Sequence, residues 1–215
     1  MLFSVAYFPP VEYFAAIAND FAIAANPSLV YMEGCENYQK QSYRNRCRFY
    51  AADGVQTLSV PVVHENGTYQ LPIREIKIDY STPWLIRTQR AIVSAYETSA
   101  YFDYYKDDLF SIMDSRPQLL FDLDMALIHF FLHKTGILAD IRFTDNFSPI
   151  GSDQYGLDLR EVIHPKRRND ILKTLQLEKP YFQVFAQKYG FIPNLSIMDL
   201  LFNEGPESII YLKKL

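Results

Sequence analysis

The N-terminal segment constrains the fold more than any other part of the sequence. Residues 2–7 form an apolar run rich in β-forming residues, which ends at Phe8-Pro9-Pro10. Proline fits the first turn of a helix, and residues 11–18 carry apolar side chains at helical spacing. A strand, a tight turn and a helix make up the front half of a βαβ unit. An α/β fold is therefore predicted, in which ligands usually bind at the carboxyl ends of the strands. A plain strand-to-helix joint is the alternative.

The rest of the chain supplies further strands and many helices. Four more strands are predicted, over residues 28–33, 57–63, 72–79 and 139–144. Asn66-Gly67 predicts a turn between the middle two. Helices are predicted over residues 82–96, 107–113, 117–134, 181–189, 196–203 and 206–212. The expected fold is α/β, with a mixed or mostly parallel sheet flanked by helices, a helical C-terminal part and one domain over residues 1–215.

Composition and missing motifs exclude several classes of protein. The net charge of -4 disfavours a dedicated nucleic-acid binder, which needs a broad basic surface. No glycine-rich phosphate loop follows the first strand, which disfavours a standard dinucleotide site or P-loop. Cys35 and Cys47 are too few for a disulfide scaffold and indicate reduced thiols in a cytoplasmic protein. Neither a signal peptide nor an apolar run of membrane-spanning length is evident.

The most polar stretch is residues 39–48 (QKQSYRNRCR), which contains four cations. On a strand, Arg44, Arg46 and Arg48 would share one face. Guanidinium groups match phosphate or carboxylate with paired hydrogen bonds. The stretch therefore predicts a site for a small anionic ligand, such as the phosphates of a nucleotide or a phosphorylated sugar. A solvated strand edge, where charge blocks unwanted pairing, is the alternative.

Three residues near basic groups are candidates for proton transfer. Glu33 and Glu36 lie just before the arginines and could orient them or act as acid and base, although an ordinary charge pair also explains them. His164 precedes Lys166-Arg167-Arg168, and cations lower the pKa of a histidine, which would keep it neutral near pH 7. The alternative for this second basic cluster is an exposed loop.

Two other patterns favour packing over chemistry. His129 and His133 have the spacing of a helical metal pair, but no HExxH motif surrounds them, and we predict no metal site. Residues 96–105 hold four tyrosines and one phenylalanine, which suit either an aromatic ligand wall or a packed joint between helices.

The chain resembles the WbqC-like protein family over nearly its whole length. The most specific features are the Tyr-Phe-Pro run that begins at Tyr7 and the pair Asn45-Arg46. The matching segments are residues 6–14 (AYFPPVEYF), 36–46 (ENYQKQSYRNR), 59–62 (SVPV), Trp84, residues 94–105, 163–166 (IHPK), 181–185 (YFQVF) and 191–203, which begins FIPNLS and ends FN.

This resemblance implies a transferase-like role in bacterial surface polysaccharide biosynthesis, with Tyr7 among the substrate-binding residues. Many relatives carry a His-Gln-Pro-like run before the Tyr-Phe-Pro, where this chain has Ser4-Val5-Ala6, so no role of that histidine is carried over. Nucleotidylyl-transferase-like folds also use a His-rich motif there. Its absence disfavours nucleotidyl transfer and leaves nucleotide-sugar binding open.

The leading hypothesis is a transferase that acts on a nucleotide-linked or phosphorylated sugar. Arg44 and Arg46, with Lys40, would bind the anion; Gln41 and Asn45 would bond the sugar or base. Either His164 or Glu36 would move the proton. The alternative is a non-catalytic binding or scaffold protein in the same pathway, with the aromatic segment as its contact. The sequence names no cofactor and leaves a homo-oligomer open.

Overall fold

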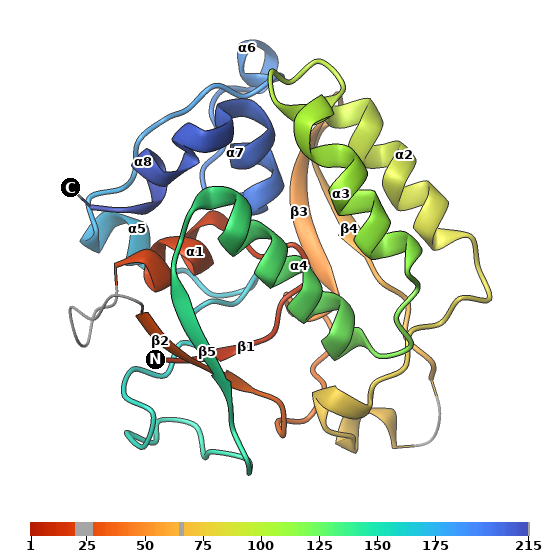
Figure 1. Cartoon of the computed structure of the whole chain (residues 1–215), viewed down its shortest axis with the longest axis vertical. Helices are drawn as coiled ribbons and strands as arrows, with labels where there is room; N and C mark the ends of the chain where they lie inside the picture. Colours follow the sequence, from red (N-terminus) through yellow and green to blue (C-terminus); the bar gives the residue numbers. More distant parts are fainter. Residues whose placement is uncertain (20–27, 65–66, 215) are drawn as a thin grey trace.

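The computed structural model describes residues 1–19, 28–64 and 67–214 (Figure 1). The strands are β1 (Leu2–Ser4), β2 (Ser28–Glu33), β3 (Arg46–Ala51), β4 (Gly54–Ser59) and β5 (Ala139–Phe143). They form two sheets: a parallel sheet in the order β1-β2-β5, and an antiparallel ribbon of β3 and β4.

Helices pack against both sheets. The α-helices are α1 (Val11–Ala18), α2 (Trp84–Tyr96), α3 (Phe102–Asp114), α4 (Leu120–Thr135), α5 (Ile171–Thr174), α6 (Ala186–Tyr189), α7 (Ile197–Glu204) and α8 (Ser208–Leu212). Short 3-10 helices are η1 (Thr68–Gln70), η2 (Ile73–Glu75) and η3 (Gly205–Glu207). Figure 1 shows α4 in the centre, α2 and α3 beside the ribbon, and α7 and α8 above α1.

The parallel sheet is centred on β2. Its register places Leu2 of β1 beside Tyr31, and Ser28 beside Ala139 of β5. The other edge of β1 is also occupied, because Leu2 donates to the carbonyl of Leu157 and accepts from the amide of Leu159, both at 2.9 Å. In a parallel sheet of this kind, a ligand site often lies in the loops at the carboxyl ends of the strands.

The core is aromatic and continuous between the sheet and the helices. Helix α1 is buried from Val11 through Ile17, because the C-terminal helices pack against the side that does not face the sheet. Phe131 of α4 contacts both Phe8 and Phe14, with ring centroids 6.0 Å apart in each case. The tight turn at Phe8-Pro9-Pro10 is therefore held by packing as well as by its prolines.

A buried ion pair ties together the loops at the carboxyl ends of the sheet. Glu33, the last residue of β2, accepts from the Thr144 hydroxyl at 2.7 Å, the Ser148 amide at 3.0 Å and the Arg160 guanidinium at 3.1 Å. Arg160 also donates to both carboxylate oxygens of Asp158, at 2.9 and 2.6 Å. The charges of Glu33 and Arg160 are thus compensated where water is excluded.

The predicted fold class is confirmed, and so are the strand over residues 28–33 and the helix over residues 11–18. The strand predicted over residues 72–79 is wrong. That segment forms η2 and then only isolated bridges, because Ile73 and Ile76 are buried by a tight turn rather than by strand alternation. The strand predicted over residues 57–63 ends earlier, at Ser59, and Pro61 follows as a residue without an amide donor.

Two further expectations concern the turn after β4 and membrane-spanning segments. Asn66 of the predicted turn lies outside the described residues. None of the helices in the described part of the chain has the length and apolar content needed to span a bilayer.

Removal of the Arg160 guanidinium would leave Glu33 buried without its cation. We expect Arg160→Ala to lower the free energy of unfolding by about 3–5 kcal/mol, the usual loss when one partner of a buried pair is removed. Urea unfolding followed by circular dichroism measures this. The matched control is Arg167→Ala, which breaks the more exposed pair with Glu161. An equal, small loss in both variants would contradict the prediction.

Candidate functional site

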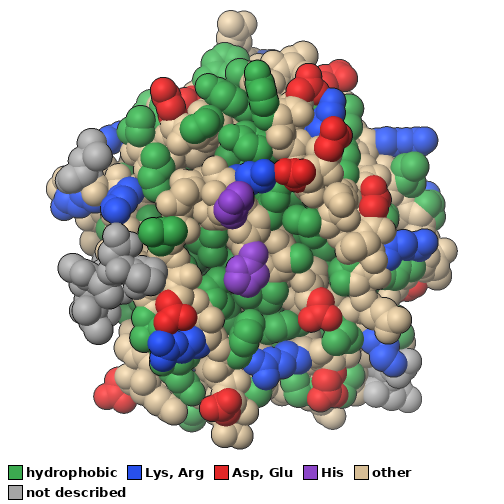
Figure 2. Space-filling model, viewed as in Figure 1, with side chains coloured by type: hydrophobic (Ala, Val, Ile, Leu, Met, Phe, Trp, Pro, Cys, Tyr) green, Lys and Arg blue, Asp and Glu red, His purple; other side chains and the backbone are tan. Residues whose placement is uncertain are grey.

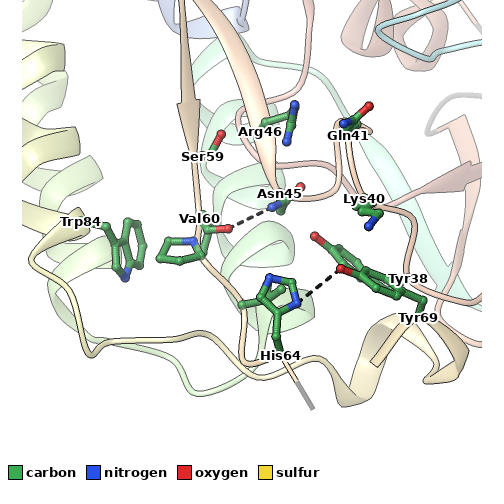
Figure 3. Close-up of a pocket in the computed structure, with 12 residues that line it drawn as sticks. Tyr38, Lys40, Gln41, Asn45, Arg46, Ser59, Val60, His64, Tyr69 and Trp84 are labelled. Atoms are coloured by element: carbon green, nitrogen blue, oxygen red, sulfur yellow. Dashed lines mark hydrogen bonds between the residues drawn. The ribbon is translucent and has the colours of Figure 1, made fainter. Parts of the chain in front are cut away.

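A cavity of about 390 Å³ opens where β3 begins, and we call it the Arg46 cavity (Figure 3). Three parts of the chain meet there: the segment before β3, the segment after β4, and the first residue of α2. Its lining consists of Tyr38, Lys40, Gln41, Asn45, Arg46, Ser59, Val60, Pro61, Val62, His64, Tyr69 and Trp84.

The polar part of the lining contains four of the residues selected from the sequence: Lys40, Gln41, Asn45 and Arg46. Asn45 is only 8% exposed, and its Nδ2 donates to the Val60 carbonyl at 3.0 Å (Figure 3). Its Oδ1 and the Nε of Arg46 are buried without a hydrogen-bond partner among the described residues. Because buried polar groups are normally paired, these two atoms are suited to bonding a ligand.

The aromatic part of the lining lies across the cavity from Arg46 and Gln41 (Figure 3). The rings of Tyr38 and Tyr69 are nearly parallel, with centroids 6.1 Å apart, and the Lys40 ammonium lies 4.4 Å from the centroid of Tyr69. The Nδ1 of His64 is 3.5 Å from the hydroxyl of Tyr69. Trp84 forms another part of the wall, and its Nε1 is buried without a partner among the described residues. The cavity thus combines cations, amides, aromatic rings and one imidazole.

Local backbone geometry brings Lys40 and Gln41 to the same cavity. Gln41 adopts a left-handed conformation with φ of 60°, and the Ser42 hydroxyl donates to the Gln39 carbonyl at 2.6 Å. The chain therefore turns sharply before β3. The far wall is fixed by the amide of Val60, which donates to the Asn45 carbonyl at 2.8 Å.

Arg44 does not share a face with Arg46 and Arg48, so the expectation of three aligned guanidiniums is wrong. Strand β3 begins only at Arg46, and Arg44 is buried before it. Its guanidinium holds both carboxylate oxygens of Glu36, at 3.0 and 2.6 Å, and also donates to Ser4 Oγ at 2.8 Å. Glu36 and Arg44 therefore form the charge pair that was the alternative interpretation of these residues.

His164 lies on a loop outside the lining of the Arg46 cavity. Its Nδ1 accepts from the Lys166 amide at 3.2 Å, and Lys166 in turn donates to the side chain of Gln41 at the cavity. The pKa of His164 is lowered, as predicted. Burial is the main cause, Arg167 lowers the pKa further, and Glu161 opposes the shift.

Tyr7 is fully buried beneath the turn that it begins. Burial raises the pKa of its hydroxyl well above the ordinary value, and the nearby thiol of Cys47 and carboxyl of Asp124 add to the shift. Asp124 of α4 is equally buried, and neither carboxylate oxygen has a hydrogen-bond partner among the described residues. Burial raises the pKa of Asp124 well above the usual range, and Arg44 only partly opposes this.

The remaining sequence candidates lie elsewhere. His129 and His133 are exposed on α4, and Figure 2 shows histidines close together on that face. The described residues contain no group of three or more His, Cys, Asp or Glu side chains arranged to hold a metal ion. In the aromatic segment, Tyr104 is 76% exposed, but Phe102 is buried and Tyr101 packs against Gly205.

Sequence reasoning did not select His64, Tyr69 or Trp84 as members of the site. His64 lies just before the predicted turn and Trp84 lies in a predicted helix, and their distance from Arg46 in the sequence gives no sign of contact. Trp84 was noted only as part of the family resemblance. Within the resemblance, however, the segment 59–62 also lines the cavity.

Comparisons with known proteins agree with the resemblance. The WbqC-like protein family matches residues 5–164. An uncharacterized protein of Mycobacterium tuberculosis is 28% identical over 195 residues, which cover 82% of this chain and 84% of that protein. No solved structure matches the chain.

The raised pKa of Asp124 predicts how stability depends on pH. The folded state keeps the proton at pH values where the unfolded chain has lost it, so this carboxyl costs stability as pH rises above about 4. Asp124→Asn removes the titration. We therefore expect the variant to gain stability relative to the wild type as pH rises, by up to about 1.4 kcal/mol per pH unit.

Urea unfolding of both proteins between pH 4 and pH 8 measures the difference. Asp122→Asn is the matched control, since it removes an exposed carboxylate from the same helix. A stability difference between wild type and Asp124→Asn that stays constant over this range would contradict the assignment.

Proposed function

The chain belongs to the WbqC-like protein family, and we propose that it is a transferase acting on a nucleotide-linked or phosphorylated sugar. The pathway in this proposal is bacterial surface polysaccharide biosynthesis. A cytoplasmic location is part of the proposal, supported by two cysteines that form no disulfide. The observation that carries the proposal is the Arg46 cavity, where cations and amides lie opposite aromatic rings.

The cationic residues fit the anionic part of such a substrate. Lys40 and Arg46 both line the cavity, and the buried Nε of Arg46 has no partner among the described residues. A guanidinium donates paired hydrogen bonds to phosphate oxygens, and these are stronger than bonds between neutral groups. Arg46 and Lys40 would therefore hold the phosphates, with the Oδ1 of Asn45 accepting from a hydroxyl or an amine of the same ligand.

The aromatic residues fit the rest of the substrate. Tyr38, Tyr69 and Trp84 present ring faces and edges, which bind the plane of a base or the apolar face of a sugar. A volume of about 390 Å³ is at the lower end of the usual range for small-molecule pockets. It accommodates part of a nucleotide sugar, with the remainder extending beyond the rim.

His64 is the residue of this cavity best suited to proton transfer. In glycosyl transfer, an acceptor oxygen bonds to the anomeric carbon as the bond from that carbon to phosphate breaks. The phosphate leaves with the electron pair, and its charge is stabilised by Arg46 and Lys40. The acceptor proton would pass to the imidazole of His64. The sequence-based candidates His164 and Glu36 lie outside this lining.

Ligand binding can be tested directly, because Trp84 is the one tryptophan of the chain and lines the cavity. Uridine, guanosine and thymidine diphosphate sugars are titrated against its fluorescence. We expect at least one of them to bind, and Arg46→Gln to weaken it about ten- to a hundredfold through loss of a charge-assisted bond. The ligand should also raise the melting temperature of the wild type more than that of Arg46→Gln.

Arg48→Gln is the matched control, since Arg48 is exposed on the same strand and outside the lining. It should bind as the wild type does. Absence of binding by every nucleotide sugar, or equal weakening in both variants, would reject the Arg46 cavity as a nucleotide-sugar site.

Catalysis is tested separately from binding. With the sugar nucleotide that binds, His64→Gln should lower the rate of nucleoside diphosphate release by about a hundredfold or more. The dissociation constant of the sugar nucleotide should change little. His164→Gln and Glu36→Gln are the comparators. Loss of release in either comparator but not in His64→Gln would return the proton transfer to the sequence-based candidates. Binding with no release in the wild type would favour the non-catalytic function.

A further inference from the structure

A second cavity, of about 420 Å³, lies at the carboxyl ends of the parallel strands. We call it the Gln39 cavity. Its lining is Cys35, Glu36, Asn37, Gln39, Phe147 and Ile150, which come from the segments that follow β2 and β5. In open α/β sheets this edge is the usual place for a ligand. The Arg46 cavity, in contrast, is built beside the antiparallel ribbon.

One extended segment separates the two cavities. Asn37 and Gln39 line the Gln39 cavity, whereas Tyr38 and Lys40 line the Arg46 cavity. This alternation is that of an extended chain, whose successive side chains point to opposite sides. The segment is held by the amide of Tyr38, which donates to the Leu71 carbonyl at 3.1 Å. The two cavities are therefore lined by alternate residues of one segment.

The chemistry of the Gln39 cavity suits a neutral polyhydroxylated ring. The side chains of Asn37 and Gln39 are exposed, and an amide both donates and accepts hydrogen bonds, as sugar hydroxyls do. Gln39 makes two long bonds, donating to Glu161 at 3.4 Å and accepting from Arg44 at 3.5 Å. Phe147 is 51% exposed and offers an aromatic face for the apolar side of a sugar ring. Among the described residues of the lining, Glu36 alone is charged, and Arg44 compensates its charge through both carboxylate oxygens.

We infer that the Gln39 cavity binds a neutral sugar, which is the acceptor in the transfer proposed for the Arg46 cavity. The acceptor role rests on that proposed function, whereas sugar binding can be measured without it. A transferase needs the reacting ends of two substrates to meet, and two cavities lined by one segment place their ligands at the same part of the chain. The carboxylate of Glu36 at the inner wall would accept a hydrogen bond from one acceptor hydroxyl.

Cys35 allows occupancy of this cavity to be measured in the intact protein. Cys35 is half-buried in the lining, whereas Cys47 is fully buried, so iodoacetamide should alkylate Cys35 first. The probes are glucose, galactose, mannose and N-acetylglucosamine at millimolar concentration. At least one should slow alkylation of Cys35, followed by mass spectrometry, and should show saturation transfer from the protein by NMR.

Variants place the bound sugar. Gln39→Ala and Phe147→Ala change exposed side chains, and we expect each to weaken protection and saturation transfer about three- to tenfold. Arg46→Gln should leave both the protection of Cys35 and the saturation transfer unchanged, because Arg46 is not part of the lining of the Gln39 cavity. Absence of saturation transfer with all four sugars overturns the inference, as does a loss of signal in Arg46→Gln that matches the loss in Gln39→Ala.

These outcomes are independent of the nucleotide-sugar titration. Sugar binding at the Gln39 cavity without nucleotide-sugar binding would support this cavity as a sugar site, and would reject both the proposed function and the acceptor role that rests on it. If the wild type binds a nucleotide sugar, Arg46→Gln weakens that binding and no neutral sugar binds, the proposed function is supported and this inference is rejected.

Discussion

The buried contact between Glu33 and Arg160 supports most of what surrounds the carboxyl edge of the sheet. A buried ion pair is costly to desolvate, and it is stable here because further donors and acceptors satisfy both groups. Glu33 receives an amide from each of the two loops it joins, from Cys35 and from Ser148. Arg160 donates to the carbonyl of Ser148 at 2.8 Å as well. Charge and hydrogen bonds therefore hold the loops that carry the Gln39 cavity.

The second buried pair, Glu36 with Arg44, shows why the sequence predicted only part of the binding site. Lys40, Gln41, Asn45 and Arg46 were found because they are close in sequence and chemically alike. Charge alone does not show which arginine faces a cavity and which one pairs with a neighbouring carboxylate. That depends on where β3 begins, and strand boundaries are poorly specified by local sequence. His64 and Trp84 join the site only through the path of the chain after β4.

The same limit explains which parts of the fold were predicted. The N-terminal strand, turn and helix, and the strand β2, follow from local patterns of apolar residues and prolines. The segment over residues 72–79 has an equally strand-like pattern, yet its isoleucines are buried by a 3-10 turn and single bridges. Alternation shows that side chains are buried, and only the tertiary structure decides which backbone buries them.

The order of the parallel sheet has a consequence for how this chain is made. β1 and β2 can pair as soon as the N-terminal residues are synthesised, but the other edge of β2 pairs with β5, and Glu33 meets Thr144 across 111 residues of sequence. Contacts so distant in sequence form slowly. Throughout synthesis of the intervening helices, β2 therefore has an unpaired edge and its final carboxylate lacks its cation. A nascent chain in this state is the form most exposed to aggregation and to chaperones.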